Sequence, residues 1–460
     1  MTMSTARRAA VVALLLSTVA ASLFGQTPLE QTPLADSAMK LNRAGLFADA
    51  AEFAVKGVRV TPSEDDRCGL IFNSIYALIR EGQLDAGRDV IKTYDMQCLA
   101  TDVAPKYANL LDILRVEGSL PPIPVTGIDM TGLDRFWAIV DTLSNDVEPS
   151  SHLWRGLMAR PGYRLALRSN DVLQRQIDIA FRPSRRAERD STLRTSGPDS
   201  TIIAHLLDAA SHRSELAAMQ TTLAKTLPDS VAAAVKRASE YLPPEALARR
   251  APPFVGLAIF ANESFSQNQA VVVDLLVARD EGLTPFLSHE FEHAYAAPLA
   301  PDASPSDATD TELYYAIRDL RNQGIADLID KPYPFQPSSP RLTAYAAGYN
   351  VAYARTPAVL RSLDSLLAAA NADPTQREEI GAQAKDLLTD DSHPNGAYMA
   401  REILQTFGRD SLVSTVYSPF AFMRLYSAAE QKQGRAAPFS PSAVAMLDFM
   451  EKRWVRPRPH

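Results

Sequence analysis

The sequence predicts a mainly α-helical protein of the α+β class, with helical hairpins followed by a mostly helical domain that contains a small β-element. Apolar residues make up 46% of the 460-residue chain and charged residues 22%, which is enough to bury a large core. Apolar side chains recur at helical spacing through most of the chain. One segment, 269–278, is instead rich in β-branched residues and is typical of a strand.

The first residues have the pattern of an export signal. Arg7 and Arg8 precede an apolar run from Ala9 to Phe24, and small and then polar residues follow. This pattern predicts a signal peptide over residues 1–26, and therefore a secreted or periplasmic protein. A retained N-terminal anchor is the alternative. No later segment is long and apolar enough to predict a membrane span. The formal net charge of −7 argues against nucleic acid as a partner.

Residues 27–120 contain two similar stretches, LNRAGLFADAAEFAV and LIREGQLDAGRDVIK. They share one pattern of glycine, apolar and small residues after a shift of 37: Gly45, Phe47 and Ala50, then Gly82, Leu84 and Gly87. The pattern resembles the turn and second helix of a tetratricopeptide-like unit, which implies a surface for a protein partner. Plain amphipathic helices with glycine turns are the alternative.

The chain has two cysteines, Cys68 and Cys98, which lie on either side of Gly82. In an antiparallel helix pair that turns near Gly82, both would reach the same end of the hairpin. We therefore expect a Cys68–Cys98 disulfide in an oxidising compartment. With no further cysteine in the chain, a cysteine-based zinc site is excluded.

The stretch GSLPPIPVTG at 118–127 marks a domain boundary, so the second domain is expected to span residues 121–460. Helical spacing predicts helices over 132–143, 201–210 and 229–242. The polar, basic segment 182–200 is expected to be an exposed loop.

The stretch FLSHEFEHAYA at 286–296 is the strongest functional signal. Thr284 is expected to cap a helix there, with Pro285 at its first position and Pro298 after its end. His289 and His293 then share one face, where both imidazoles can bind one ion, and Glu290 can reach a water on that ion. Zn²⁺ suits such a site, with Glu290 as general base. The alternative is that polar residues merely share a helical face.

A second helix is expected over the stretch TDTELYYAIRDLRNQGIADLIDKP at 309–332. Thr309 and Glu312 have capping-box spacing, and Pro332 would close the helix. Gly324 costs a helix about 1 kcal/mol relative to alanine, which suggests close approach of another element. The helix with the histidines is the expected neighbour.

These two helices together resemble the gluzincin zinc metallopeptidases. That group carries Asn-Glu-x-x-x-Asp or Glu-Gly-x-Ala-Asp on the second helix, and this chain has Asn322-Gln323-Gly324-Ile325-Ala326-Asp327. The resemblance implies Gln323 as third zinc ligand, in place of the usual Glu, and Asp327 as the residue that orients a ligand histidine. Three outcomes stay open: Gln323 binds weakly through oxygen, Asp327 is the third ligand, or the site has lost its metal.

The resemblance also implies a downstream His or Tyr that stabilises the oxyanion. The stretch 390–410 predicts a helix from Pro394 to Phe407, and it offers His393 and Tyr398 for this role. Alternatively, His393 caps the helix and Tyr398 packs in the core. A stripe of Tyr345, Tyr349 and Tyr353 is expected to belong to the core rather than to a substrate platform. The remaining histidines are expected to be structural or exposed.

The sequence therefore predicts an exported zinc-dependent peptidase that hydrolyses peptide bonds of a peptide or protein substrate. The alternative is a non-catalytic pseudopeptidase that binds peptides and whose metal site is degenerate.

Overall fold

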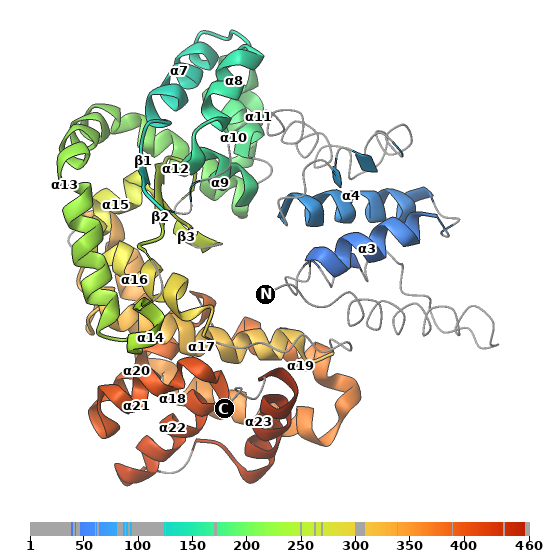
Figure 1. Cartoon of the computed structure of the whole chain (residues 1–460), viewed down its shortest axis with the longest axis vertical. Coiled ribbons are helices and arrows are strands. Elements are labelled where there is room, and N and C mark those ends of the chain that lie inside the picture. Colours follow the sequence, from blue (N-terminus) through green and yellow to red (C-terminus); the bar gives the residue numbers. More distant parts are fainter. Residues whose placement is uncertain are drawn as a thin grey trace.

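The computed structural model describes residues 126–455 with gaps at 170–172, 249–250, 262–263, 268–269, 300–308, 338, 389 and 436–437, and parts of 38–93. This part of the chain is mainly helical with one small four-stranded sheet, as the sequence predicts (Figure 1).

Two helices of the N-terminal region, α3 (Phe47–Val58) and α4 (Glu64–Arg80), pack against each other. The predicted signal peptide and much of the second predicted repeat lie outside the described residues, so the tetratricopeptide resemblance stays a prediction. Cys68 is buried on α4, but Cys98 is not described, and their predicted bond stays a prediction too. Over the described residues, no helix combines the length and apolarity needed to cross a bilayer.

The sheet has the strand order β1-β2-β4-β3, from strands β1 (Ile128–Asp129), β2 (Phe254–Ala258), β3 (Ser264–Gln267) and β4 (Ala270–Asp274). The first three in this order run parallel, and β3 lies antiparallel to β4 at the edge. Every residue of β2 and β4 is buried, which explains their continuous apolar sequences.

The strand expected over 269–278 is correct only in its first half. At Asp274 the chain enters helix α15 (Leu275–Glu281), because Asp274 Oδ1 accepts hydrogen bonds from the amides of Leu276 and Val277. Its Oδ2 accepts from the amide of Phe260 and lies 3.0 Å from His205 Nε2. Asp274 therefore ends the strand and starts the helix, and His205 is structural.

A first core joins the sheet to helix α16 (Leu283–Ala296) and to the helices that precede β2 in the chain. Besides α3 and α4, these are α7 (Leu133–Ser144), α8 (Ser151–Met158), α9 (Pro161–Ser169), α10 (Leu173–Phe181), α12 (Pro198–Ser211), α13 (Arg213–Ser239) and α14 (Pro244–Leu247), whereas α11 (Arg186–Thr192) adds no buried side chain. The prediction of an exposed loop over 182–200 is wrong in part, because α11 forms within it, although none of the α11 residues is buried.

A second core holds the C-terminal helices, which occupy the lower half of Figure 1. They are α17 (Thr311–Asp330), α18 (Thr343–Ala372), α19 (Arg377–Leu387), α20 (His393–Phe407), α21 (Arg409–Val413), α22 (Pro419–Lys432) and α23 (Pro441–Trp454). Helix α16 packs on α17, so the two cores meet along these two helices.

The predicted starts of these two helices are wrong by two residues and by one residue. Helix α16 begins at Leu283 after Gly282, whose φ of 86° favours glycine, so Thr284 lies inside the first turn. Helix α17 begins at Thr311, and its N-cap Asp310 makes no capping hydrogen bond. Asp310 pairs instead with Arg453 of α23, at 3.2 Å, which replaces the expected capping box with a long-range ion pair.

Gly324 marks a close helix crossing, but its partner is α20 rather than the expected α16. Gly324 and Gly396 face each other so closely that a Cβ on either would overlap backbone atoms of the opposite helix. Glycine is needed here because the two backbones are in contact. The crossing brings the first turn of α20, with His393, against the last turns of α17, with Asp327.

This crossing yields a stability prediction. Gly324→Ala should lower the free energy of unfolding by about 1–3 kcal/mol, because the added methyl forces the helices apart. Gly348→Ala is the matched control: it lies in α18 with no heavy atom near its would-be Cβ, and should be neutral or stabilising. Urea denaturation monitored by circular dichroism measures both. Equal stability of the two variants would contradict the close contact.

Candidate metal centre

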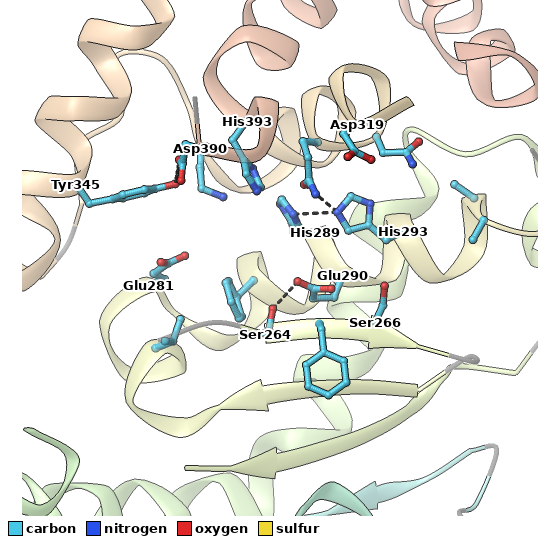
Figure 2. Close-up of a pocket in the computed structure, with 18 of the residues that line it drawn as sticks. Ser264, Ser266, Glu281, His289, Glu290, His293, Asp319, Tyr345, Asp390 and His393 are labelled. Carbon is cyan, nitrogen blue, oxygen red and sulfur yellow. Dashed lines mark hydrogen bonds between the residues drawn. The ribbon is translucent and has the colours of Figure 1, made fainter. Parts of the chain in front are cut away.

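A cavity of about 880 Å³ lies where the two cores meet. Figure 2 shows His289, Glu290 and His293 of α16 and His393 of α20 around it, with Ser264 of the edge strand β3 close to Glu290. Residues from β3, α15, α16, α17 and α20 line the cavity, so it combines both halves of the fold.

Three potential ligand atoms converge in this cavity. His289 Nε2 and His293 Nε2 are 3.1 Å apart, and Gln323 Oε1 of α17 is 3.1 Å from His293 Nε2. Ligands at about 2.1 Å from a tetrahedral zinc ion lie roughly 3.3 Å from one another. The spacing of these atoms therefore fits a metal centre formed by His289, His293 and Gln323.

The opposite ring nitrogens determine the tautomers of these histidines. His289 Nδ1 lies 3.2 Å from Asp330 Oδ1, and His293 Nδ1 lies 3.4 Å from Glu292 Oε2. Asp330 can accept a hydrogen bond from His289 Nδ1, and the negative charge of Glu292 favours the proton of His293 on Nδ1, so each Nε2 of a neutral ring presents a lone pair. Two lone pairs and an amide oxygen then face one another, an arrangement that requires a proton or a cation between them.

The electrostatics at His293 favour a positive charge at this point. Burial alone would lower the pKa of His293, but the carboxylates of Glu292 and Glu290 more than offset burial and raise it. In the metal-free protein a proton supplies this positive charge, and a divalent cation would supply more of it.

Asp327 lies on the Nδ1 side of His289, away from Gln323. With His289 and His393 it forms a second group of possible ligands, within 4.8 Å of one another. Its oxygens, however, are occupied: Oδ1 lies 2.9 Å from both His393 Nδ1 and Lys331 Nζ, and Tyr349 donates to Oδ2 at 2.9 Å. A metal cation there would be repelled by the Lys331 ammonium, so this geometry favours Gln323 over Asp327 as third ligand.

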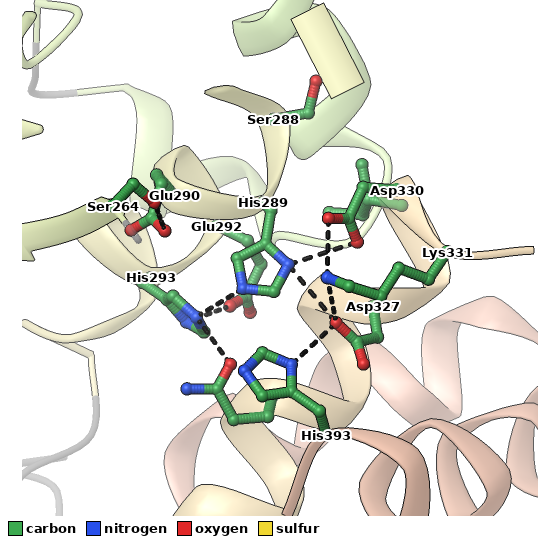
Figure 3. A network of polar contacts seen from close by, with 12 residues as sticks. Ser264, Ser288, His289, Glu290, Glu292, His293, Asp327, Asp330, Lys331 and His393 are labelled. Carbon is green, nitrogen blue, oxygen red and sulfur yellow. Dashed lines mark hydrogen bonds and ion pairs between the residues drawn. The ribbon is translucent and has the colours of Figure 1, made fainter. Parts of the chain in front are cut away.

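The charges around Asp327 stabilise one another. Burial opposes the ionised carboxyl, yet His393 and Lys331 hold the pKa of Asp327 below its usual range. Burial likewise opposes a charged His393, and Asp327 raises its pKa in spite of it. The network in Figure 3 is therefore one of paired charges, which is the condition for keeping charges inside a protein.

The structure separates the two candidates for an oxyanion donor. His393 lines the cavity, where its ring stacks on that of His289 with centroids 5.4 Å apart. Tyr398 does not line it, and its ring instead packs between Tyr353 and Tyr426. The alternative in which Tyr398 belongs to the core matches its position.

Other tyrosines and a serine have roles that the sequence did not reveal. Tyr349 and Tyr353 are buried, as expected for a core stripe, but Tyr345 lines the cavity and donates to Asp390 Oδ2 at 3.0 Å. Ser264 donates a hydrogen bond to Glu290 Oε1. Ser264 comes from a strand that no sequence pattern indicated, so the contact with Glu290 was not predictable.

Glu292 forms a buried ion pair with Arg321 of α17, with 3.2 Å between Oε1 and Nη2. Burial alone would raise the pKa of Glu292, but Arg321 and His293 hold it below its usual range. The pair joins α16 to α17 behind the metal centre and fixes the carboxylate that His293 Nδ1 faces.

Fold and site together define a mostly helical protein with a candidate metal centre, built on an HExxH sequence, in a cavity where its two cores meet. Residues 154–434, more than half of the chain, match the family described as "Putative zinc dependent peptidase (DUF5700)", and the chain belongs to this family. Membership supports a zinc-dependent peptidase, and hence a hydrolase, in general terms. Neither the curated proteins nor the solved structures contain a match to this chain.

The buried pair can be tested by mutation. Arg321→Leu should lower the free energy of unfolding by about 3–5 kcal/mol, because Glu292 is left as an uncompensated buried charge. The double variant Arg321→Leu/Glu292→Leu should recover much of that loss, since it removes both charges. Thermal unfolding of the three proteins measures the effect. A double variant no more stable than Arg321→Leu would contradict a charge-based cause.

Proposed function

We propose that this protein is an exported zinc-dependent peptidase that hydrolyses peptide bonds of a peptide or protein substrate. The observation that carries the proposal is the convergence of His289 Nε2, His293 Nε2 and Gln323 Oε1 in a cavity that also holds Glu290. Export to the periplasm or beyond rests on the signal-like N-terminus.

Each chain residue of the centre has a chemical task. A zinc ion held by His289, His293 and Gln323 would lower the pKa of a coordinated water towards about 7 and polarise the scissile carbonyl. Glu290 takes a proton from the attacking water and passes it to the leaving amine. The hydroxyl of Ser264, which donates to Glu290 Oε1, keeps this carboxylate in place.

His393 is the better-placed donor to the oxyanion of the tetrahedral intermediate. Asp327 accepts from its Nδ1 at 2.9 Å, so the opposite edge of the ring remains available to the cavity. Asp327 also raises the pKa of His393 and so favours the charged, donating form. A preorganised charged donor is the type of group that stabilises a developing negative charge.

The edge strand β3 offers a way to position an extended peptide. It pairs with β4 on one side and is the last strand in the sheet order, and Ser264, Phe265 and Ser266 line the cavity. An extended substrate can add to such an edge through main-chain hydrogen bonds, which would place its peptide bond beside Glu290.

Glu290→Gln tests the assignment of the general base. The variant should lose activity on a mixture of peptides by about 10²–10⁴-fold, because an amide cannot accept the proton from water. Zinc content, measured by elemental analysis, should stay at the wild-type level because Glu290 is not a ligand. Retained activity, or loss of zinc, would each contradict the role.

Gln323→Glu tests the third ligand. Replacing the neutral amide with a carboxylate should raise zinc affinity about tenfold or more, measured by competition with a chelator. Asn322→Asp is the matched control, because it adds a carboxylate to the lining of the same cavity one residue away from the proposed ligand. Equal gains in both variants would show a general charge effect and would remove Gln323 from the ligand set.

A non-catalytic peptide-binding protein is the second candidate, because Gln323 brings no charge to the position where the resembled enzymes carry Glu. Absence of zinc in the purified protein, together with peptide binding that a chelator does not affect, would establish it.

A further inference from the structure

The two histidines that flank Asp327 are not oriented by the same carboxylate. Asp327 Oδ1 is 2.9 Å from His393 Nδ1 but 3.5 Å from His289 Nδ1. Asp330, three residues later on the same face of α17, has its Oδ1 at 3.2 Å from His289 Nδ1. Figure 3 shows Asp330 in contact with His289, and Asp327 in contact with both His393 and, at the longer distance, His289.

The other contacts of the carboxylates reinforce this division. Asp327 has Lys331 and His393 on Oδ1 and Tyr349 on Oδ2, so donors already occupy both oxygens. Asp330 uses Oδ1 for His289 and Oδ2 for Lys331 Nζ, at 2.9 Å. Its side chain is only 3% exposed, so water does not compete strongly for these contacts.

We propose that Asp330 is the positioning residue for the metal ligand His289, while Asp327 positions the oxyanion donor His393. Lys331 lies between the two carboxylates, 2.9 Å from each, and holds them side by side. The proposal rests on the proposed function in one respect, namely that His289 binds zinc.

The physical consequence is that two tasks can be separated by mutation. Asp330 keeps the proton of His289 on Nδ1 and thereby leaves the Nε2 lone pair for the metal. An asparagine at 330 can donate to Nδ1 instead, which stabilises the tautomer with the proton on Nε2 and blocks metal binding. An asparagine at 327 would disturb His393 in the same way and leave the metal ligand largely intact.

The test compares Asp330→Asn and Asp327→Asn in the full-length protein. Asp330→Asn should weaken zinc binding about 10–100-fold, measured by chelator competition, and Asp327→Asn should weaken it much less. At saturating zinc, Asp327→Asn should show the larger loss of kcat. Asp448→Asn, which removes a carboxylate of α23 that is paired with Arg424 and does not line the cavity, should leave zinc affinity unchanged. A larger loss of zinc affinity in Asp327→Asn than in Asp330→Asn would overturn the proposal.

A second measurement and a second variant keep the test decisive if Asp330→Asn does not fold. Nitrogen-15 NMR of the histidines in the zinc-free protein should show the proton of His289 on Nδ1 in the wild type and on Nε2 in Asp330→Asn. If Asp330→Asn does not fold, Asp330→Glu retains the charge beside Lys331 and displaces the carboxylate by one methylene. Weaker zinc binding by Asp330→Glu then supports the proposal, and unchanged binding overturns it.

Failure of the proposed peptidase function gives results that differ from failure of the positioning role of Asp330. If zinc binding follows the expected order but no peptide is cleaved, the positioning role stands and the proposed reaction is wrong. If the wild type binds no zinc, the proposed function is wrong, and the NMR tautomer of His289 alone decides the role of Asp330.

Discussion

The close crossing of α17 and α20 is the constraint on which the site depends. Because Gly324 and Gly396 have no side chains, the two helix backbones touch, and His393 reaches Asp327. The same helix α17 presents Gln323 to the histidines of α16 and Arg321 to Glu292. One helix therefore supplies a candidate ligand, the carboxylates behind two imidazoles and the cation that anchors α16.

Sequence patterns could place the candidate site residues together because their spacing along each helix is local. His289 and His293 share a face through the helical repeat alone, and the register from Gln323 to Asp327 follows from the same repeat. The helical class and the helix predicted from Pro394 to Phe407, which the structure has as His393–Phe407, were confirmed for the same reason. The close approach of another helix at Gly324 was also predicted correctly, because the unfavourable helix propensity of glycine was enough to indicate it.

The rest of the structure depends on partners that are distant in the chain, and the sequence could not assign them. Asp274 ends strand β4 by capping helix α15, so the segment 269–278, which the sequence predicts as one strand, divides into a strand and a helix. The expected capping box gives way to Arg453, which lies 143 residues from Asp310. Asp330 carries no motif, and only the folded geometry shows that it is closer to His289 Nδ1 than Asp327 is.

The charges around the centre offer a reason why a neutral glutamine can occupy a ligand position. Glu290, Glu292, Asp327 and Asp330 face three compensating cations, Arg321, Lys331 and the charged form of His393, which leaves an excess of negative charge at His289 and His293. The raised pKa values of His293 and His393 report the same excess, because protons are attracted to it. A divalent cation would be stabilised by this field even without a charged third ligand. In the proposed centre the surrounding carboxylates would supply at short range the charge that Gln323 lacks, while Gln323 would supply the oxygen.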